Sequence, residues 1–144
     1  MADISEHAPT FITVRYGENE RCLLNTQCQL ILLLDAVIQK SRCRFDDTID
    51  LCEEDGTMLN LPEMLSDQKT YAVEFVDDRA TYIAVKMTKK VDSDGFVYTP
   101  LLGRSFMQID YPEANKRLIA MSSGKKVDKK KFRNMKKTKT PRKV

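Results

Sequence analysis

The chain has 144 residues, of which 42% are hydrophobic, and its 24 Lys and Arg nearly balance 21 Asp and Glu. This composition suits one domain with its own core, and the longest apolar run, residues 30–34, is far shorter than the roughly 20 residues of a membrane span. The first residues lack the basic start and apolar stretch of a secretory signal, so we expect an intracellular, cytoplasmic protein.

The first predicted elements are a β-hairpin and a long helix. Residues 11–16 alternate apolar and polar side chains, and a turn at residues 17–20 leads into a second strand over residues 21–25. Thr26 and Gln29 have the spacing of a capping box, in which a hydroxyl and an amide satisfy the first N–H groups of a helix. The helix is expected to end near residues 40–42, where basic side chains suit its carboxyl end. Its apolar face consists of Leu30, Leu33, Leu34, Val37 and Ile38.

The middle of the chain predicts further strands. Residues 48–52 alternate with Ile49 and Leu51 directed inward, and Gly56 supplies the positive φ of the turn that follows. A short strand returns over residues 58–61, residues 71–76 fit either a strand or a helical turn, and residues 81–87 form a clearer strand. Beyond these, an extended stretch covers residues 96–102 and a short helix covers about residues 112–121.

This order of elements resembles the β-grasp, or ubiquitin-like, fold: a hairpin, a helix across it, a second hairpin and a last strand. The resemblance implies an α+β fold with a mixed sheet and one main helix, followed by a C-terminal extension and a basic tail. The first and last strands would pair in parallel at the centre of the sheet and face the helix. The expected contacts bury Ile12, Val14, Ile83 and Val85 against Leu30 and Leu34. The expected limits are 1–9 for a flexible N-terminus, 10–88 for the β-grasp domain, 89–121 for the extension and 122–144 for the tail.

Two finer resemblances rest on short motifs. The Glu-Asp-Gly-Thr turn at residues 54–57, Leu-Pro-Glu-Met-Leu at 61–65 and Thr-Tyr-Ile-Ala-Val at 81–85 look doublecortin-like. Doublecortin-like domains bind microtubules. Residues 47–58, with Asn25-Thr26 and Pro100-Leu-Leu102, are similar to a small eukaryotic family of uncharacterised open-reading-frame proteins, one of them encoded on the human X chromosome. That similarity implies a fold and no activity.

The chain departs from ubiquitin at its end. A conjugated modifier must end in Gly-Gly, whereas this chain ends in Pro-Arg-Lys-Val and none of its five glycines are adjacent. We therefore expect that it is not a conjugated modifier.

Motifs for catalysis and metal binding are missing from the sequence. No C-x-x-C occurs among Cys22, Cys28, Cys43 and Cys52, and His7 is the only histidine, whereas zinc needs about four N or S ligands at close spacing. We expect these cysteines to be mostly small buried apolar residues. There is no G-x-S-x-G, P-loop or G-x-G-x-x-G. The prediction is a protein that is not an enzyme, with no catalytic residue, metal or cofactor.

Acidic residues are concentrated in the middle of the chain. Residues 46–78 hold eleven Asp and Glu against one base, Lys69, for a net charge of −10. One interpretation is a solvated face. Another is that the tail folds back on this stretch, but exposed ion pairs contribute only about 0–1 kcal/mol each, so such closure would be weak.

The tail is the strongest pointer to function. Residues 122–144 hold eleven Lys and Arg and one acid, for a net charge of +10, whereas the first 121 residues carry 13 bases and 20 acids, for a net charge of −7. A block of one sign is usually an interaction tail, and this one is too poor in apolar residues to fold alone. The expected partner-binding residues are Lys125, Lys126, Lys129, Lys130, Lys131, Arg133, Lys136, Lys137, Lys139, Arg142 and Lys143. Thr140, which precedes a proline, is a candidate phosphorylation site, where phosphate would subtract about 1.5–2 charges.

Three kinds of acidic partner suit such a tail. A flexible basic segment can lie along the acidic surface of a microtubule while the folded body takes a fixed place. Nucleic acid is the second, through phosphate contacts, although Phe132 alone is available for stacking and the acidic body would repel a duplex. An anionic membrane is not expected, because no lipidation motif or long apolar face accompanies the tail.

The leading hypothesis is a non-catalytic structural protein that docks in a large intracellular assembly, with tubulin in a microtubule or ciliary axoneme as partner. One alternative is a nucleic-acid- or ribosome-associated protein. Its location would extend to the nucleus, because Lys-rich runs resemble nuclear import signals. The other is a soluble ubiquitin-like adaptor that binds a peptide at a sheet edge.

Overall fold

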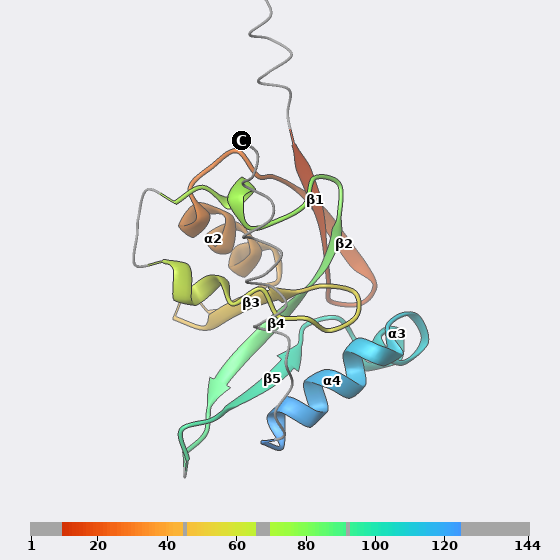
Figure 1. Ribbon diagram of the computed structural model, residues 1–144. Coiled ribbons are helices and arrows are strands. Elements are labelled where there is room, and N and C mark those ends of the chain that lie inside the picture. Colours follow the sequence, from red (N-terminus) through yellow and green to blue (C-terminus); the bar gives the residue numbers. More distant parts are fainter. Residues whose placement is uncertain (1–9, 45, 66–69, 92, 125–144) are drawn as a thin grey trace, which may run out of the picture.

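A five-stranded mixed sheet forms the centre of the fold (Figure 1). The computed structural model describes residues 10–44, 46–65, 70–91 and 93–124. The strands are β1 (Phe11–Tyr16), β2 (Glu20–Asn25), β3 (Thr48–Cys52), β4 (Thr81–Lys89) and β5 (Phe96–Pro100). β1 and β2 form the predicted antiparallel hairpin, and β4 pairs in parallel with β1, as expected. β4 also pairs antiparallel with β3 and β5, so the chain is an α+β protein with β4 at its centre.

β1 and β5 share one side of β4, one after the other. β1 pairs with residues 81–83 of β4, and β5 pairs with residues 85–89. The join is made by backbone hydrogen bonds: the Gly17 N–H donates to the Leu101 carbonyl at 2.8 Å, and the Gly103 N–H donates to the Gly17 carbonyl at 2.9 Å. The sheet therefore continues from the end of β1 into the segment after β5.

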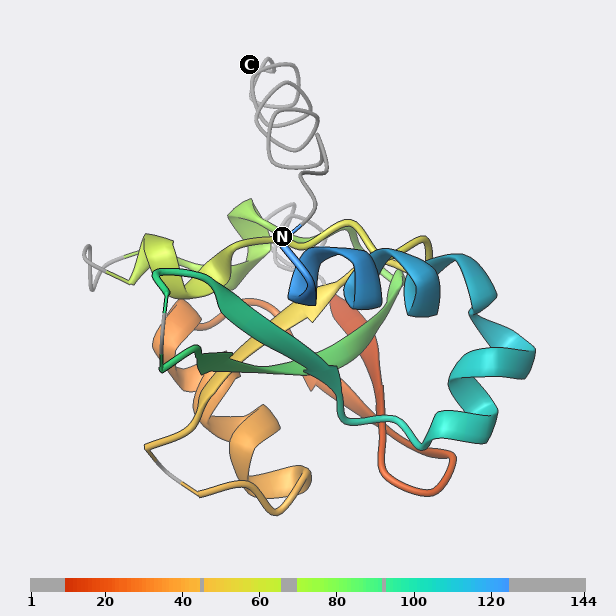
Figure 2. The same cartoon turned by 90° about the horizontal axis from the view of Figure 1, so that it is seen from below.

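The two faces of the sheet carry separate apolar clusters, and Figure 2 shows α2 on one side of the sheet and α3 and α4 on the other. Val14 of β1 lies beside Tyr82 of β4, so Tyr82 and Ala84 point to the same face as Ile12 and Val14. Leu30 and Leu34 of the main helix complete this first cluster, as predicted. The prediction that Ile83 and Val85 join them is wrong, because they alternate to the opposite face and belong to the second cluster.

The main helix, α2 (Leu30–Lys40), covers the first face and ends where the sequence predicts. The predicted capping box is wrong. Gln29 occupies the cap position, but no side chain caps the helix, and the Leu30 N–H instead donates to the Thr70 carbonyl at 2.8 Å. Thr26 is fully buried, and its hydroxyl bonds the hydroxyl of Thr10 across the β1–β2 hairpin. The Thr26 hydroxyl, predicted to cap the helix, therefore stabilises the hairpin of the sheet instead.

Two C-terminal helices cover the second face. They are α3 (Arg104–Asp110), which the sequence did not predict, and α4 (Pro112–Ser122), which it did. Met107, Leu118 and Met121 pack with Ile83 and Val85 in the second cluster. Arg15 of β1 ties the helices to the hairpin: its Nη1 donates to Asp110 Oδ2 at 3.2 Å and to the Tyr111 hydroxyl at 3.1 Å.

The connection from β3 to β4 is mostly irregular. Met58 forms only an isolated bridge with Cys52, so the predicted strand over residues 58–61 is reduced to one bridge. The 3-10 helices η1 (Leu61–Met64) and η2 (Ala72–Glu74) follow, and η2 shows that the stretch from residue 71 turns helically. Gly56 has the expected positive φ of 93°. A Cβ at this position would lie 2.9 Å from the Ala114 Cα, so the turn also needs glycine to approach α4.

Candidate functional site

The tail residues predicted to bind a partner lie outside the described residues, which end at residue 124. All eleven bases from Lys125 to Lys143 and the candidate phosphorylation site Thr140 therefore remain predictions. The structure does show how the described chain reaches that point. α4 is anchored by Leu118, which is 1% exposed, and by Met121. Ser122 adds a polar anchor, because its hydroxyl accepts the Tyr98 N–H at 2.9 Å and donates to the Leu118 carbonyl at 2.8 Å.

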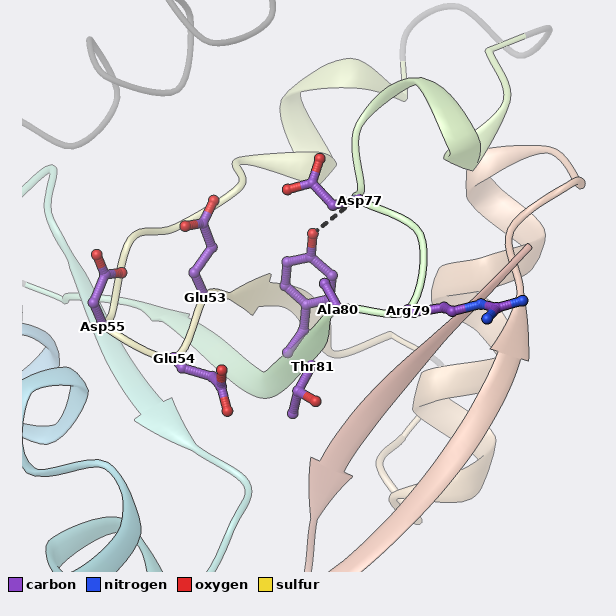
Figure 3. Close-up of a pocket in the computed structure, with 8 residues that line it drawn as sticks. Glu53, Glu54, Asp55, Asp77, Arg79, Ala80 and Thr81 are labelled. Atoms are coloured by element: carbon purple, nitrogen blue, oxygen red, sulfur yellow. Dashed lines mark hydrogen bonds between the residues drawn. The ribbon is translucent and has the colours of Figure 1, made fainter. Parts of the chain in front are cut away.

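An acidic depression lies where β3 ends and β4 begins (Figure 3). These two strand ends meet because β3 and β4 are antiparallel neighbours. The turn after β3 contributes three acids, and the segment before β4 contributes one acid and one base. The cavity has a volume of about 420 Å³, and it is lined by Glu53, Glu54, Asp55, Asp77, Arg79, Ala80, Thr81 and Tyr82.

The walls of the acidic depression are held by hydrogen bonds. The Asp77 N–H donates to the hydroxyl of the buried Tyr82 at 2.9 Å (Figure 3), which fixes the segment before β4. The Thr57 N–H donates to Asp55 Oδ1 at 2.9 Å. Partial burial acts to raise the pKa of Asp55, but the hydrogen bonds from Thr57 and the charge of Arg117 outweigh it and hold that pKa below its ordinary value. Asp55 is therefore a firmly ionised carboxylate at neutral pH.

The chemistry open to this depression is charge attraction. Arg79 lies on its rim and pairs with Asp78 at 3.7 Å, and its side chain is 80% exposed. Within the described ranges, no group of three or more His, Cys, Asp or Glu side chains is arranged to hold a metal ion. The depression can accept ammonium or guanidinium groups from a basic segment, without a geometry that would select one of them.

The acidic stretch over residues 46–78 is not one solvated face, because Asp50 is fully buried. Its carboxylate accepts three backbone N–H groups, from Leu51 at 2.7 Å and from Asn60 and Leu61 at 3.0 Å each. Burial raises the pKa of Asp50 to about 6, although those three hydrogen bonds act to lower it. The role of Asp50 is to hold the segment before η1 against β3. The alternation of side chains along residues 48–52 predicts that Asp50 lies on the polar side of the strand. No local pattern in the sequence indicates the backbone N–H groups that it accepts.

The four cysteines carry free thiols. Cys52 is fully buried, and the others are half-buried and pack against the first cluster. Burial raises the pKa of the Cys52 thiol far above its ordinary value, and the nearby carboxylates of Asp50 and Asp55 add to this effect. Because the thiolate is the nucleophilic form, Cys52 is chemically inert at neutral pH.

The fold and these surfaces define an α+β protein whose central sheet is covered on both faces and whose strand ends carry an acidic depression. No helix within the described ranges has the length and apolar character needed to cross a membrane. No solved structure matches the chain.

The chain belongs to the family whose sequence model is described as "Il2rg: Putative Interleukin 2 receptor, gamma chain" and matches residues 16–105. It is also 32% identical over 116 residues to the human "Uncharacterized protein C22orf15", covering 78% of this chain and 77% of that relative. The predicted membership of a small eukaryotic family of uncharacterised open-reading-frame proteins is therefore confirmed. This relative does not test the resemblance to the family member encoded on the human X chromosome. The receptor name belongs to the family model and assigns no partner to this chain.

Proposed function

We propose that this protein is a non-catalytic interaction module that docks in a large intracellular assembly, with the acidic surface of a microtubule or axoneme as its binding surface. The observation that carries the proposal is the position of the basic tail. A segment with a net charge of +10 follows directly on a helix whose last turns are buried against the sheet. The tail would supply charge attraction and reach, while the body supplies a fixed orientation.

We assign the body to the β-grasp class within this proposal. The parallel pairing of β1 with β4 and the single helix α2 on one face support that assignment. The second layer, α3 and α4, is an addition to such a domain that leaves the first face unchanged. Because one fold hosts many functions, the doublecortin-like resemblance supports microtubules only by analogy.

Co-sedimentation with microtubules tests the proposal. In the tail variant, Lys129, Lys130 and Lys131 are replaced by Gln, which lowers the net charge of the tail from +10 to +7. We expect the Kd of this variant to be about tenfold higher than that of the unmodified chain, which corresponds to about 1.4 kcal/mol over three contacts. The Kd of the unmodified chain should depend steeply on salt. The matched control replaces three lysines of the body, Lys89, Lys90 and Lys116, by Gln. It should bind microtubules with the same Kd as the unmodified chain.

Two results would reject the microtubule proposal. One is the absence of pelleting by the full chain at low salt. The other is salt-sensitive RNA binding that is lost when the tail is deleted, in a chain that does not bind microtubules. This result would favour the nucleic-acid alternative. Binding that survives deletion of residues 122–144 would place the specificity in the folded body. For Thr140, we expect Thr140→Asp to weaken binding, and unchanged affinity would count against a phosphorylation switch there.

A further inference from the structure

Two of the three outer edges of the sheet are covered by the chain itself. Along β3, the Leu59 N–H donates to the Leu51 carbonyl at 3.0 Å, and the Asp50 carboxylate takes two further N–H groups from residues 60 and 61. Along β5, the Ser122 hydroxyl accepts the Tyr98 N–H, and Pro100 has no N–H to offer. Such cover is how proteins prevent unwanted strand pairing.

Within the described residues, the third edge, β2, is covered only at its last residue, where the Asn25 carbonyl accepts the Cys28 Sγ–H at 3.4 Å. The Thr26 N–H donates to the Thr10 carbonyl, which places the even-numbered residues of the hairpin in its internal hydrogen bonds. Arg21, Leu23 and Asn25 therefore turn their N–H and C=O groups outward. β2 contains neither proline nor lysine, and its pairing with β1 runs without a bulge. Proline, lysine and a bulge are therefore missing from this edge, and its charged residues, Glu20 and Arg21, lie at one end of the strand.

The side chain at the centre of this edge is apolar. Leu23 is 68% exposed, although it lies in the middle of a paired strand. It shares its face with Phe11, which is 37% exposed and lies opposite Asn25 in the hairpin register. A hydrogen-bonding edge with an exposed leucine at its centre is suited to receive another strand.

We propose that the β2 edge pairs antiparallel with the β2 edge of a second copy of this chain, with Leu23 opposite its own equivalent. Two five-stranded sheets then become one ten-stranded sheet. The two-fold axis is perpendicular to the sheet, so both α2 helices lie on the same face. This association rests on the β2 edge and is independent of the tail and of the proposed function.

The register follows from hydrogen bonding and charge. The outward groups at residues 21, 23 and 25 are symmetric about Leu23, so pairing about Leu23 uses all three. The Asn25 carbonyl can join because it has a second lone pair beside the one that the Cys28 thiol uses. Arg21 then lies opposite the second copy's Asn25, whose side-chain oxygen accepts the Gln27 N–H at 2.7 Å and has a second lone pair for the guanidinium. A shift of the axis by one residue places Leu23 opposite the second copy's Arg21, and a shift by two places Arg21 opposite Arg21. The register about Leu23 alone joins apolar to apolar and leaves no like charges opposed.

The size of the edge sets the strength of the pairing. β2 has six residues, and two such strands bury less than the roughly 1,600 Å² of a stable complex. We therefore expect a reversible dimer whose population rises with concentration.

Sedimentation velocity of the full chain, from about 10 μM to about 1 mM, tests this proposal. Leu23→Lys and Leu23→Glu should each weaken dimerisation at least tenfold, because the pairing places residue 23 opposite itself and like charges repel there. An equimolar mixture of the two variants should recover a heterodimer. Ile119→Lys is the matched control, since Ile119 is 61% exposed but lies on α4. Circular dichroism should show unchanged folding for all three variants, because none of these side chains is buried.

Each outcome decides the question. A wild-type chain that stays monomeric at about 1 mM overturns the proposal and leaves the β2 edge to an extended peptide of another protein. A dimer that persists in Leu23→Lys overturns it as well. Two monomeric variants whose mixture also stays monomeric overturn the pairing of Leu23 with itself. Recovery in the mixture alone supports the edge and its register together.

Discussion

Replacing Asp50 by Ala would remove the single acceptor of three backbone N–H groups. Leu51 and Leu61, which supply two of them, are fully buried, so water cannot replace the carboxylate. A buried donor left unsatisfied costs about 1–3 kcal/mol. Two of them cost about 2–6 kcal/mol, and relief of the buried charge offsets part of this. We therefore expect Asp50→Ala to lower the free energy of unfolding by about 3 kcal/mol at pH 7.

The assay is urea unfolding followed by circular dichroism, since the chain has no tryptophan. The midpoint should fall without a change in slope. A loss of less than about 1 kcal/mol would refute the view that Asp50 holds the segment before η1 in place.

The pKa of Asp50 adds a pH dependence with a definite sign. Its ordinary value is 3.8 and burial in the fold raises it to about 6, so the folded state binds the proton more tightly than the unfolded state. Ionisation of Asp50 therefore lowers the free energy of unfolding above pH 6, and this loss disappears as the pH falls below 4. Relative to Asp50→Asn, which cannot ionise, the wild-type chain should gain up to about 3 kcal/mol between pH 7 and pH 4. A difference that stays constant over this range would refute the raised pKa.

Three further predictions concern positions where local chemistry is specific. Gly124→Ala should cost about 1 kcal/mol in urea unfolding, whereas Gly56→Ala should cost about 1–3 kcal/mol more, because both glycines have similar positive φ but only at Gly56 does an added Cβ meet α4; equal costs would contradict the close approach. Thr26→Val should lower stability by about 1 kcal/mol, because the hydroxyl bonds across the hairpin, and Gln29→Ala should lower it by less than about 0.5 kcal/mol, because no side chain caps the helix; a loss of about 1 kcal/mol in Gln29→Ala would contradict the absence of a side-chain cap. Arg15→Lys should lower the Tm by a few degrees, because a lysine cannot reach both acceptors on the C-terminal helices; an unchanged Tm would show that this tie contributes nothing.

The hairpin and the main helix could be predicted from the spacing of apolar residues along β1 and α2, and the parallel strand pair was implied by the resemblance to the β-grasp order. The faces of β4 could not be predicted, because Tyr82, Ile83, Ala84 and Val85 are all apolar when both sides of a strand are covered. Alternation then carries no information on which residues share a face. The missing signal was the second layer, and α3 in particular has only Met107 fully buried.

Polar residues were the other source of error. A threonine before a helix is usually read as a cap, but the hydroxyl of Thr26 is used across the hairpin. An aspartate on the polar side of a strand is usually read as exposed, but Asp50 is enclosed by a segment ten residues away. Both partners lie far along the chain, where local pattern does not reach. For the candidate site, the acids of the turn after β3 were apparent in the sequence, whereas their meeting with Asp77 and Arg79 depends on the fold.

The side chains of β4 alternate between the two apolar clusters, so both clusters depend on this one strand. Melting of α4 would admit water to Ile83 and Val85, and the same strand holds Tyr82 beneath α2. We expect the amides of β4 to be the slowest in the molecule to exchange with deuterium and to open only with the whole fold. Loss of α4 would therefore weaken β4, the strand with which β1 of the N-terminal hairpin pairs.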